Sequence, residues 1–172
     1  ALQVAAAGGA STVFGTASSR KLEGIAALGL PLDVPVDRHG DDFADVVELE
    51  TGGHGADVIL DTVGADYWGR NVACLAEQGR LVLVGLLGGR TVEVDLGALL
   101  RGRLHVVGTV LRARSRAEKA ALTAAVRDRL LPLFEDGRLR PVVDRTFPLA
   151  GAADAHDCMA SNENLGKLVL EI

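Results

Sequence analysis

The sequence predicts an α/β protein with a doubly wound parallel sheet that is truncated at its N-terminus. Only 3% of its 172 residues are aromatic, while Ala, Val, Leu and 21 glycines dominate. This composition suits helices packed on a parallel sheet better than a β-sandwich. Short apolar runs also alternate with helical patterns. The most informative run, residues 79–89, predicts a buried parallel strand that ends in a flexible glycine-rich loop, where α/β sheets bind ligands.

The first half of the chain is expected to alternate helices and strands. Ser18 or Ser19 can cap one helix, Asp41 and Asp42 supply an acidic first turn to another, and Asp66 is a further capping candidate. The expected segments are the end of a helix over residues 1–7, a strand over 12–16, a helix over 19–29, a strand over 33–36, a helix over 43–51, a strand over 58–60 and a helix over 67–75.

The second half continues the alternation and changes character at Pro141. Ser115 and Glu118 have the spacing of a capping box and open the longest helical pattern, which continues to Gly137. The other expected segments are a strand over residues 80–84, a brief alternation over 92–94, a helical turn over 96–100, a strand over 104–110, extended runs at 142–143 and 147–149, a helix over 150–159 and a strand over 168–170. We therefore expect one domain over residues 1–140 and a C-terminal return segment over residues 141–172.

Composition and charge exclude several classes of partner. The net charge of −5 gives no long-range attraction to nucleic acid or anionic lipid. The longest apolar runs fall far below the roughly 20 residues that cross a bilayer, so no membrane segment is expected. Cys74 and Cys158 lie far apart without a disulfide pattern, and we interpret them as reduced thiols of a cytoplasmic protein.

The chain offers no clear metal site or catalytic group. Its four histidines lack the spacing of zinc ligands, so we expect no metal. The absence of Gly-x-Ser-x-Gly disfavours a hydrolase. Tyr67 is followed four residues later by Asn71 and not by lysine, which disfavours the mechanism of short-chain dehydrogenases. Catalytic residues remain unassigned.

Two places can contact a dinucleotide. The strand expected over residues 12–16 corresponds to the second strand of a complete dinucleotide fold. It is followed by Ser18, Ser19, Arg20 and Lys21, without the acidic residue that binds the ribose of NAD. Two hydroxyls and two cations suit a 2′-phosphate, although a helix cap followed by a solvated basic turn explains the same residues. Gly64 and residues 85–89 can bring backbone groups close to a nicotinamide, although glycines after strands also form ordinary turns.

The sequence resembles the zinc-independent, zeta-crystallin-like NADPH:quinone oxidoreductases of the medium-chain dehydrogenase/reductase superfamily, and in particular their p53-inducible branch. The resemblance covers almost the whole chain. The residues that carry it are Asp61 to Gly64, Asp66 to Trp68, Asn71, Cys74, Leu75, Gly79, Arg80, Gly85 to Gly89, Leu111, Arg112, Arg114, Pro141, Asp144, Arg145, Ala155, His156, Asn164, Gly166 and Lys167.

The resemblance implies the Rossmann-like cofactor half of an enzyme that transfers hydride from NADPH to a quinone. The catalytic domain, the first strand and the glycine-rich pyrophosphate loop would be missing, and residues 141–172 would pack on that absent domain. The implied cofactor-binding residues are Ser18, Ser19, Arg20, Lys21 and Arg38 at the adenosine end, Val63, Gly64, Gly85, Leu86, Leu87, Leu111 and Arg112 at the nicotinamide end, and Lys167 near the pyrophosphate. Ser18 replaces the family's usual glycine, and Arg38 its adenine-stacking tyrosine.

The resemblance also implies a homodimer through the apolar segment that begins at Leu104 and ends at Val110. The isolated chain is expected to show little or no turnover. The alternative to an enzyme is a non-catalytic Rossmann-like module for dimerisation or interaction. A methyltransferase-like or nucleotide-sensing fold is disfavoured because no acidic residue follows the second strand.

Overall fold

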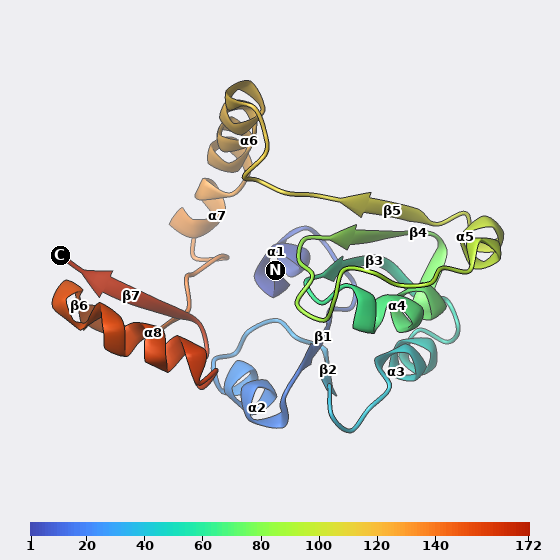
Figure 1. Cartoon of the computed structure of the whole chain (residues 1–172), viewed down its shortest axis with the longest axis horizontal. Helices are drawn as coiled ribbons and strands as arrows, with labels where there is room; N and C mark the ends of the chain where they lie inside the picture. The colour runs from blue at the N-terminus through green and yellow to red at the C-terminus, as the bar shows by residue number, and fades with distance from the viewer. The chain divides into compact units, whose positions relative to one another are not determined.

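A computed structural model describes all residues from 1 to 172 and divides the chain into two compact units (Figure 1). Residues 36–121 form the central unit, and residues 1–35 together with 122–172 form the terminal unit. None of the helices combines the length and the apolar character that a bilayer crossing requires.

The core of the central unit is a parallel sheet in the order β3 (Ala56–Asp61), β4 (Leu75–Leu83), β5 (His105–Gly108). Leu81 of the middle strand pairs in register with Ile59 of β3 and Val106 of β5, and its side chain is fully buried. Strand β4 is therefore the axis of this unit, and the carboxyl ends of all three strands meet at one edge.

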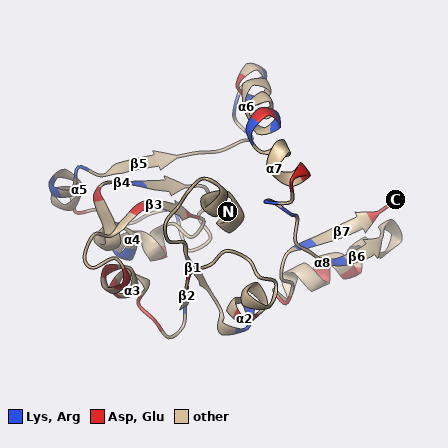
Figure 2. Cartoon of the chain, turned by 180° about the vertical axis from the view of Figure 1, so that it is seen from behind, with Lys and Arg blue, Asp and Glu red and all other residues tan.

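Two helices, α3 (Phe43–Glu50) and α4 (Trp68–Cys74), lie on the same side of this sheet (Figure 1). Asp42 caps α3 by accepting from the Ala44 N–H at 2.9 Å. One face of α3 is acidic and exposed (Figure 2), while Phe43 on its other face packs against Tyr67 with ring centroids 4.9 Å apart. The Arg70 guanidinium lies over both rings, which joins the two helices by cation–π contacts.

The central unit also contains the 3₁₀ turn η1 (Ala65–Tyr67) and the helix α5 (Leu96–Gly102). Asp95 caps α5 by accepting from the Gly97 N–H at 2.7 Å. Arg103 ends this helix in the left-handed conformation and forms an ion pair with Glu77, which ties the end of α5 to β4. The alternation expected at residues 92–94 does not form a strand.

The terminal unit combines both ends of the chain. Its elements are α1 (Leu2–Ala7), β1 (Phe14–Ala17), α2 (Ser19–Ala27), α7 (Leu131–Glu135), β6 (Val143–Pro148), η2 (Leu149–Gly151), α8 (Ala152–Ala160) and β7 (Lys167–Glu171), while β2 (Val34–Asp37) and α6 (Arg116–Arg129) cross the boundary between the units. Strand β6 pairs with β7 in parallel, and α8 packs on this pair. The Gln3 amide bonds both backbone groups of Arg140, accepting at 2.7 Å and donating at 3.0 Å, which joins α1 to the chain before β6.

Most expected segments form, and the exceptions have local causes. The long helix expected from Ser115 to Gly137 is two helices, α6 and α7, since Pro132 stands in the first turn of the second and cannot donate to the preceding turn. Asp66 does not cap α4, because residues 65–67 form a 3₁₀ turn and Tyr67 occupies the cap position. The domain division at residue 140 stays a prediction.

The capping box of α6 forms as expected and is a pH-sensitive element. The Ser115 N–H donates to the Glu118 carboxylate at 2.8 Å, and the Glu118 N–H donates to the Ser115 hydroxyl at 3.2 Å. Hydrogen bonding from the Ser115 side chain, and to a lesser extent from the Ser115 backbone N–H, lowers the pKa of Glu118. The box therefore stabilises α6 above the unfolded-state pKa of Glu118, and this contribution is lost as the pH falls through the lowered folded-state pKa.

We predict that Ser115→Ala raises the pKa of Glu118 toward its ordinary value, because the hydroxyl partner is lost. Titration of the Glu118 carboxyl carbon by NMR measures this change. The exposed Ser11→Ala variant is the control and leaves the Glu118 titration unchanged. An identical titration curve in Ser115→Ala would contradict the contribution of the Ser115 hydroxyl to the lowered pKa of Glu118.

Candidate functional site

Two loops at the carboxyl ends of β3 and β4 are fastened to each other along their backbones. We call residues 61–66 and 84–89 the paired loops; both belong to the central unit. The hydrogen bonds that join them run from Val84 N to Asp61 O (2.8 Å), from Leu87 N to Thr62 O (3.1 Å), from Gly88 N to Val63 O (2.7 Å), from Ala65 N to Gly89 O (3.0 Å) and from Asp66 N to Gly88 O (3.3 Å). The sequence predicts a flexible loop after β4, whereas the structure shows one whose backbone is held by its neighbour.

Glycines make this close approach possible. A Cβ atom on Gly64 would lie 2.7 Å from the Gly89 oxygen, and one on Gly85 would lie 2.8 Å from the Thr62 oxygen. Gly64 also has a φ of +84° and a ψ of −123°, a conformation that residues with a side chain rarely adopt. Gly64 and Gly85 are therefore required for the close backbone contact between the paired loops.

The turn after β3 is built around the buried carboxylate of Asp61, which is 4% exposed. It accepts hydrogen bonds from the Val63 N–H at 2.6 Å, from the Gly64 N–H at 3.1 Å and from the Asn71 side-chain amide at 3.0 Å. Asn71 is itself 2% exposed and comes from α4. This network satisfies the buried charge and fixes the direction of the chain as it leaves the strand.

From the sequence alone, neither Asp61 nor Asn71 has an assigned site role. The available signals were an acidic residue at the end of an apolar strand and a polar residue among the apolar positions of the next helix. Both signals are weak in a single sequence, because neither residue reveals its partner until the turn is closed.

The structure brings five predicted nicotinamide-end residues together in the paired loops: Val63, Gly64, Gly85, Leu86 and Leu87. The Leu86 and Leu87 side chains are 51% and 87% exposed, so the joint presents apolar groups outward. Such a surface, next to fixed backbone groups, suits the face and amide of a flat polar ring.

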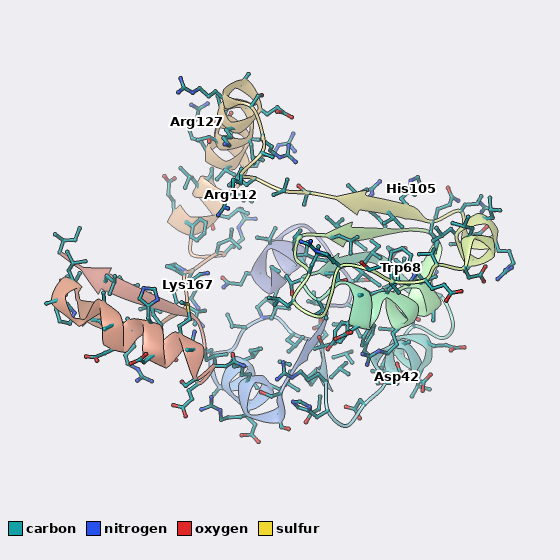
Figure 3. The ribbon with its side chains drawn as sticks, viewed as in Figure 1. Asp42, Trp68, His105, Arg112, Arg127 and Lys167 are labelled. Atoms are coloured by element: carbon teal, nitrogen blue, oxygen red, sulfur yellow. The ribbon has the colours of Figure 1, made fainter.

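Leu111 and Arg112 lie in the turn after β5, which leaves the same edge of the sheet. The Thr109 N–H donates to the Leu83 oxygen at 3.0 Å, which keeps the start of this turn beside β4. Arg114 donates to the Thr109 hydroxyl at 3.0 Å, and Lys119 donates to the Arg112 backbone oxygen at 3.0 Å. These bonds fold the turn, while the Arg112 side chain itself is exposed (Figure 3).

Arg38 lies in the turn after β2 and belongs to the central unit. Its Nε donates to the Nε2 atom of His39 at 3.0 Å, so His39 acts as an acceptor there. The His39 N–H donates in turn to the Asp37 carboxylate at 3.0 Å. The Arg38 side chain is exposed.

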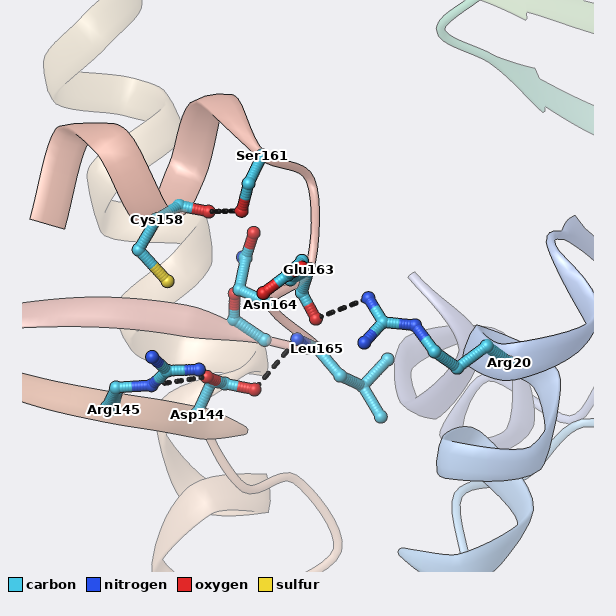
Figure 4. Close-up of polar contacts among 9 residues, drawn as sticks. Arg20, Asp144, Arg145, Cys158, Ser161, Glu163, Asn164 and Leu165 are labelled. Carbon is cyan, nitrogen blue, oxygen red and sulfur yellow. Dashed lines mark hydrogen bonds and ion pairs between the residues drawn. The ribbon is translucent and has the colours of Figure 1, made fainter.

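The terminal unit holds the other predicted residues. Ser18 occupies the cap position of α2 but makes no side-chain capping bond, and no acidic residue lies in the first turn. Arg20 Nη2 donates to the Glu163 backbone oxygen at 2.8 Å, and Lys21 Nζ donates to the Asn162 side-chain oxygen at 2.6 Å. The segment that receives Arg20 is drawn in Figure 4. The contact of Lys21 with Asn162 was not predicted, since the two residues are 141 positions apart in the sequence.

Ser19 begins α2 next to these cations, and Lys167 is the first residue of β7 in the same unit. The Lys167 N–H donates to the Val142 oxygen at 2.8 Å, while its side chain is exposed (Figure 3). The predicted residues thus form two sets, with Ser18, Ser19, Arg20, Lys21 and Lys167 in the terminal unit and the others in the central unit.

Neither cysteine is placed as a nucleophile. Cys74 is buried at the end of α4, and burial raises the pKa of its thiol to about 11. The thiol therefore stays protonated near neutral pH. Cys158 is a free thiol in α8 that lies outside the two sets.

Comparisons with known proteins point to one family. The sequence profile of the family described as zinc-binding dehydrogenase matches residues 30–170. The quinone oxidoreductase of Pseudomonas aeruginosa is 36% identical over 126 residues, which cover 73% of this chain and 38% of that protein. The 2-haloacrylate reductase of a Burkholderia species is 33% identical over 170 residues, which cover 93% of this chain and 48% of that protein. The chain thus spans less than half the length of these curated relatives.

Solved structures agree with the fold. The quinone oxidoreductase of Pseudomonas syringae pv. Tomato DC3000 has a TM-score of 0.81 and 26% identity, over 99% of this chain and 52% of that one. Parallel sheets with helices between their strands, together with this likeness, confirm the predicted doubly wound α/β class.

The family description names zinc, and the residues of this chain do not fit a zinc site. Structural and catalytic zinc ions take three or four ligands from Cys, His, Asp and Glu side chains. No group of three such side chains comes together in the structure. This chain's own residues therefore do not assemble a zinc centre.

We predict that Asp61→Asn lowers the free energy of unfolding by about 2 kcal/mol, because an amide cannot accept from all three donors that surround the carboxylate. Urea unfolding measures the change. Asp57→Asn is the matched control on the same strand and costs at most about 1 kcal/mol, since its partner is the exposed His54. Equal effects of the two substitutions would contradict the role assigned to Asp61.

We predict that Gly64→Ala destabilises the chain by about 2 to 3 kcal/mol, through backbone strain and overlap with the Gly89 oxygen. Gly69→Ala, in α4 with open space around its Cβ position, is the control and is neutral or stabilising. Thermal unfolding of both variants tests the paired loops. A Gly64→Ala protein as stable as the unaltered chain would show that the joint does not persist in solution.

Proposed function

Because this chain belongs to the zinc-binding dehydrogenase family, we propose that it is the cofactor-binding part of an oxidoreductase that transfers hydride from NADPH to a quinone or a similar activated acceptor. The resemblance to quinone oxidoreductases predicted from the sequence is confirmed by relatives and solved structures of that name. The choice of NADPH rests on the residues at the start of α2. Ser18, Arg20 and Lys21 lie there together, and the first turn contains no acidic residue.

At the adenosine end, the proposal assigns the 2′-phosphate to Ser18, Ser19, Arg20 and Lys21. A 2′-phosphate carries nearly two negative charges, which cations and hydroxyl groups stabilise by charge-assisted hydrogen bonds. An acidic residue at this place would instead accept from the 2′-hydroxyl of NAD and repel a phosphate. Ser18 makes no capping bond to the helix, which favours a ligand role over the alternative of an ordinary cap.

At the nicotinamide end, the proposal assigns the paired loops, Leu111 and Arg112. The loops supply fixed backbone groups beside exposed leucine side chains, so a ring can be oriented without rearrangement of the chain. Arg38 and Lys167 complete the proposed contacts, with Arg38 near the adenine and Lys167 near the pyrophosphate.

The nicotinamide, when bound, supplies the hydride. The residues of this chain hold and orient the cofactor, and none of them is proposed as a proton donor. Hydride transfer to a quinone gives the hydroquinone anion, which can take its proton from water, and the name of the P. aeruginosa relative supports this class of acceptor. The relative that reduces a 2-haloacrylate supports activated alkenes as similar acceptors. The two free cysteines accord with the proposed cytoplasmic location.

A second candidate function is a non-catalytic dimerisation module. Strand β5 lies at the edge of the central sheet, and all four of its residues are exposed. An apolar edge of this kind pairs readily with another strand. We therefore propose a homodimer through residues 104–110, which is compatible with either function. Binding of NADPH distinguishes the two candidate functions, because a non-catalytic dimerisation module is not expected to bind NADPH more tightly than NADH.

We predict that the chain binds NADPH more tightly than NADH, and that Lys21→Ala reduces this preference by about tenfold, since one charge-assisted contact is lost. Isothermal titration with both cofactors measures the ratio. Arg127→Ala in α6 removes an equal charge outside the proposed site and leaves the ratio unchanged. A ratio near one in the unaltered chain would overturn the proposed cofactor.

A further inference from the structure

The loop between α8 and β7 is held in one conformation by its own hydrogen bonds. The Ser161 hydroxyl donates to the Cys158 oxygen at 2.9 Å, and the Asn164 amide donates to the Gly166 oxygen at 2.9 Å. The Leu165 N–H donates to the Asp144 carboxylate at 2.8 Å (Figure 4). Asn162 has a φ of +55°, the left-handed conformation that asparagine tolerates better than most residues. We call residues 161–166 the return loop.

The return loop lies on the face of α2 that carries Arg20, Lys21 and Gly24. Gly24 lies in the interior of a helix, where glycine is unfavourable by roughly 1 kcal/mol relative to alanine. A Cβ atom at this position would overlap the Leu165 side chain. The missing side chain thus lets the loop dock one turn beyond the two cations.

The acceptors that the loop offers are uncharged. Lys21 donates to an amide oxygen, and Arg20 donates to the backbone oxygen of Glu163 and not to its carboxylate. Other exposed arginines of this chain pair with carboxylates, as in Arg101 with Asp95, Arg127 with Asp128 and Arg138 with Asp136. The loop therefore fixes the two cations of α2 without neutralising them.

Most donors of both cations remain for a ligand. A lysine ammonium has three N–H donors and an arginine guanidinium has five. The contacts to the loop use one donor of each group. Holding a long side chain in place before a ligand arrives removes part of the rotamer entropy that binding would otherwise cost.

We infer that Asn162 is a positioning residue for selection of the 2′-phosphate, and that it acts by holding the Lys21 ammonium where the phosphate binds. The inference rests on the proposed function, since it deepens the assignment of Ser18 to Lys21. It extends that subsite to the return loop, which lies near the opposite end of the chain. All of these residues belong to the terminal unit.

The test uses the 172-residue chain and two probes, 2′,5′-ADP and 5′-AMP, which differ by the 2′-phosphate alone. Asn162→Gly removes the acceptor and keeps a backbone that tolerates a positive φ. We expect it to weaken binding of 2′,5′-ADP about fivefold, the order expected for one freed lysine side chain, and to leave 5′-AMP unchanged. In a Lys21→Ala background the same substitution has no further effect.

Four results would overturn the inference. They are a fivefold loss for both probes, a loss that persists in the Lys21→Ala background, tighter binding of 2′,5′-ADP by Asn162→Gly, and unchanged binding of 2′,5′-ADP. The third would mean that the loop competes with the phosphate. The thermal midpoint of Asn162→Gly shows separately whether the variant is folded, and a loss that tracks unfolding affects both probes alike. If the unaltered chain does not prefer 2′,5′-ADP, the proposed cofactor fails as well.

Discussion

The paired loops of the candidate site depend on the hydrogen bonds that the buried Asp61 carboxylate accepts. A charge removed from water is tolerated only when donors surround it, and here the donors are two backbone N–H groups of the following turn and the amide of Asn71. Since two donors belong to the turn itself, satisfying the charge also determines the path of residues 62–64. That path places the Thr62 and Val63 oxygens where the loop after β4 can donate to them. One polar contact in the core thus sets the geometry of both loops.

The glycines of these loops show how the same residue type supports opposite expectations. A run such as residues 85–89 predicts mobility because glycine restricts the backbone least. In the structure the missing Cβ atoms allow two backbones to approach closely enough for direct hydrogen bonds. Closely bonded backbone is pre-organised, so it can orient a ligand at little entropic cost. The exposed leucines then lie on a fixed support and not on a mobile lid.

The order of elements could be predicted from the sequence because its signals are local. The Ser115–Glu118 capping box depends on residues three positions apart and forms as predicted. Asp42, expected in an acidic first turn, instead caps α3. The break before α7 was not predicted, because the apolar pattern of residues 115–137 continues across Leu130 and Pro132. At the candidate site, residue types at strand ends were predictable. Their partners were not, because the contacts of Asp61 with Asn71 and of Lys21 with Asn162 exist only after the chain has folded.

The charged groups of this chain differ in how many of their hydrogen-bonding positions are used within the protein. Asp61 is buried, and its carboxylate accepts from three donor groups of the protein, so it acts on the backbone. Arg20 and Lys21 each donate one hydrogen bond to an uncharged oxygen and retain their charge and their other donors. A cation paired with a carboxylate has already lost much of its attraction for an anion, as in Arg138 with Asp136. A cation held by uncharged acceptors is oriented and keeps its attraction for an anion. This difference distinguishes the charged groups that stabilise the fold from Arg20 and Lys21, which are suited to bind a phosphate.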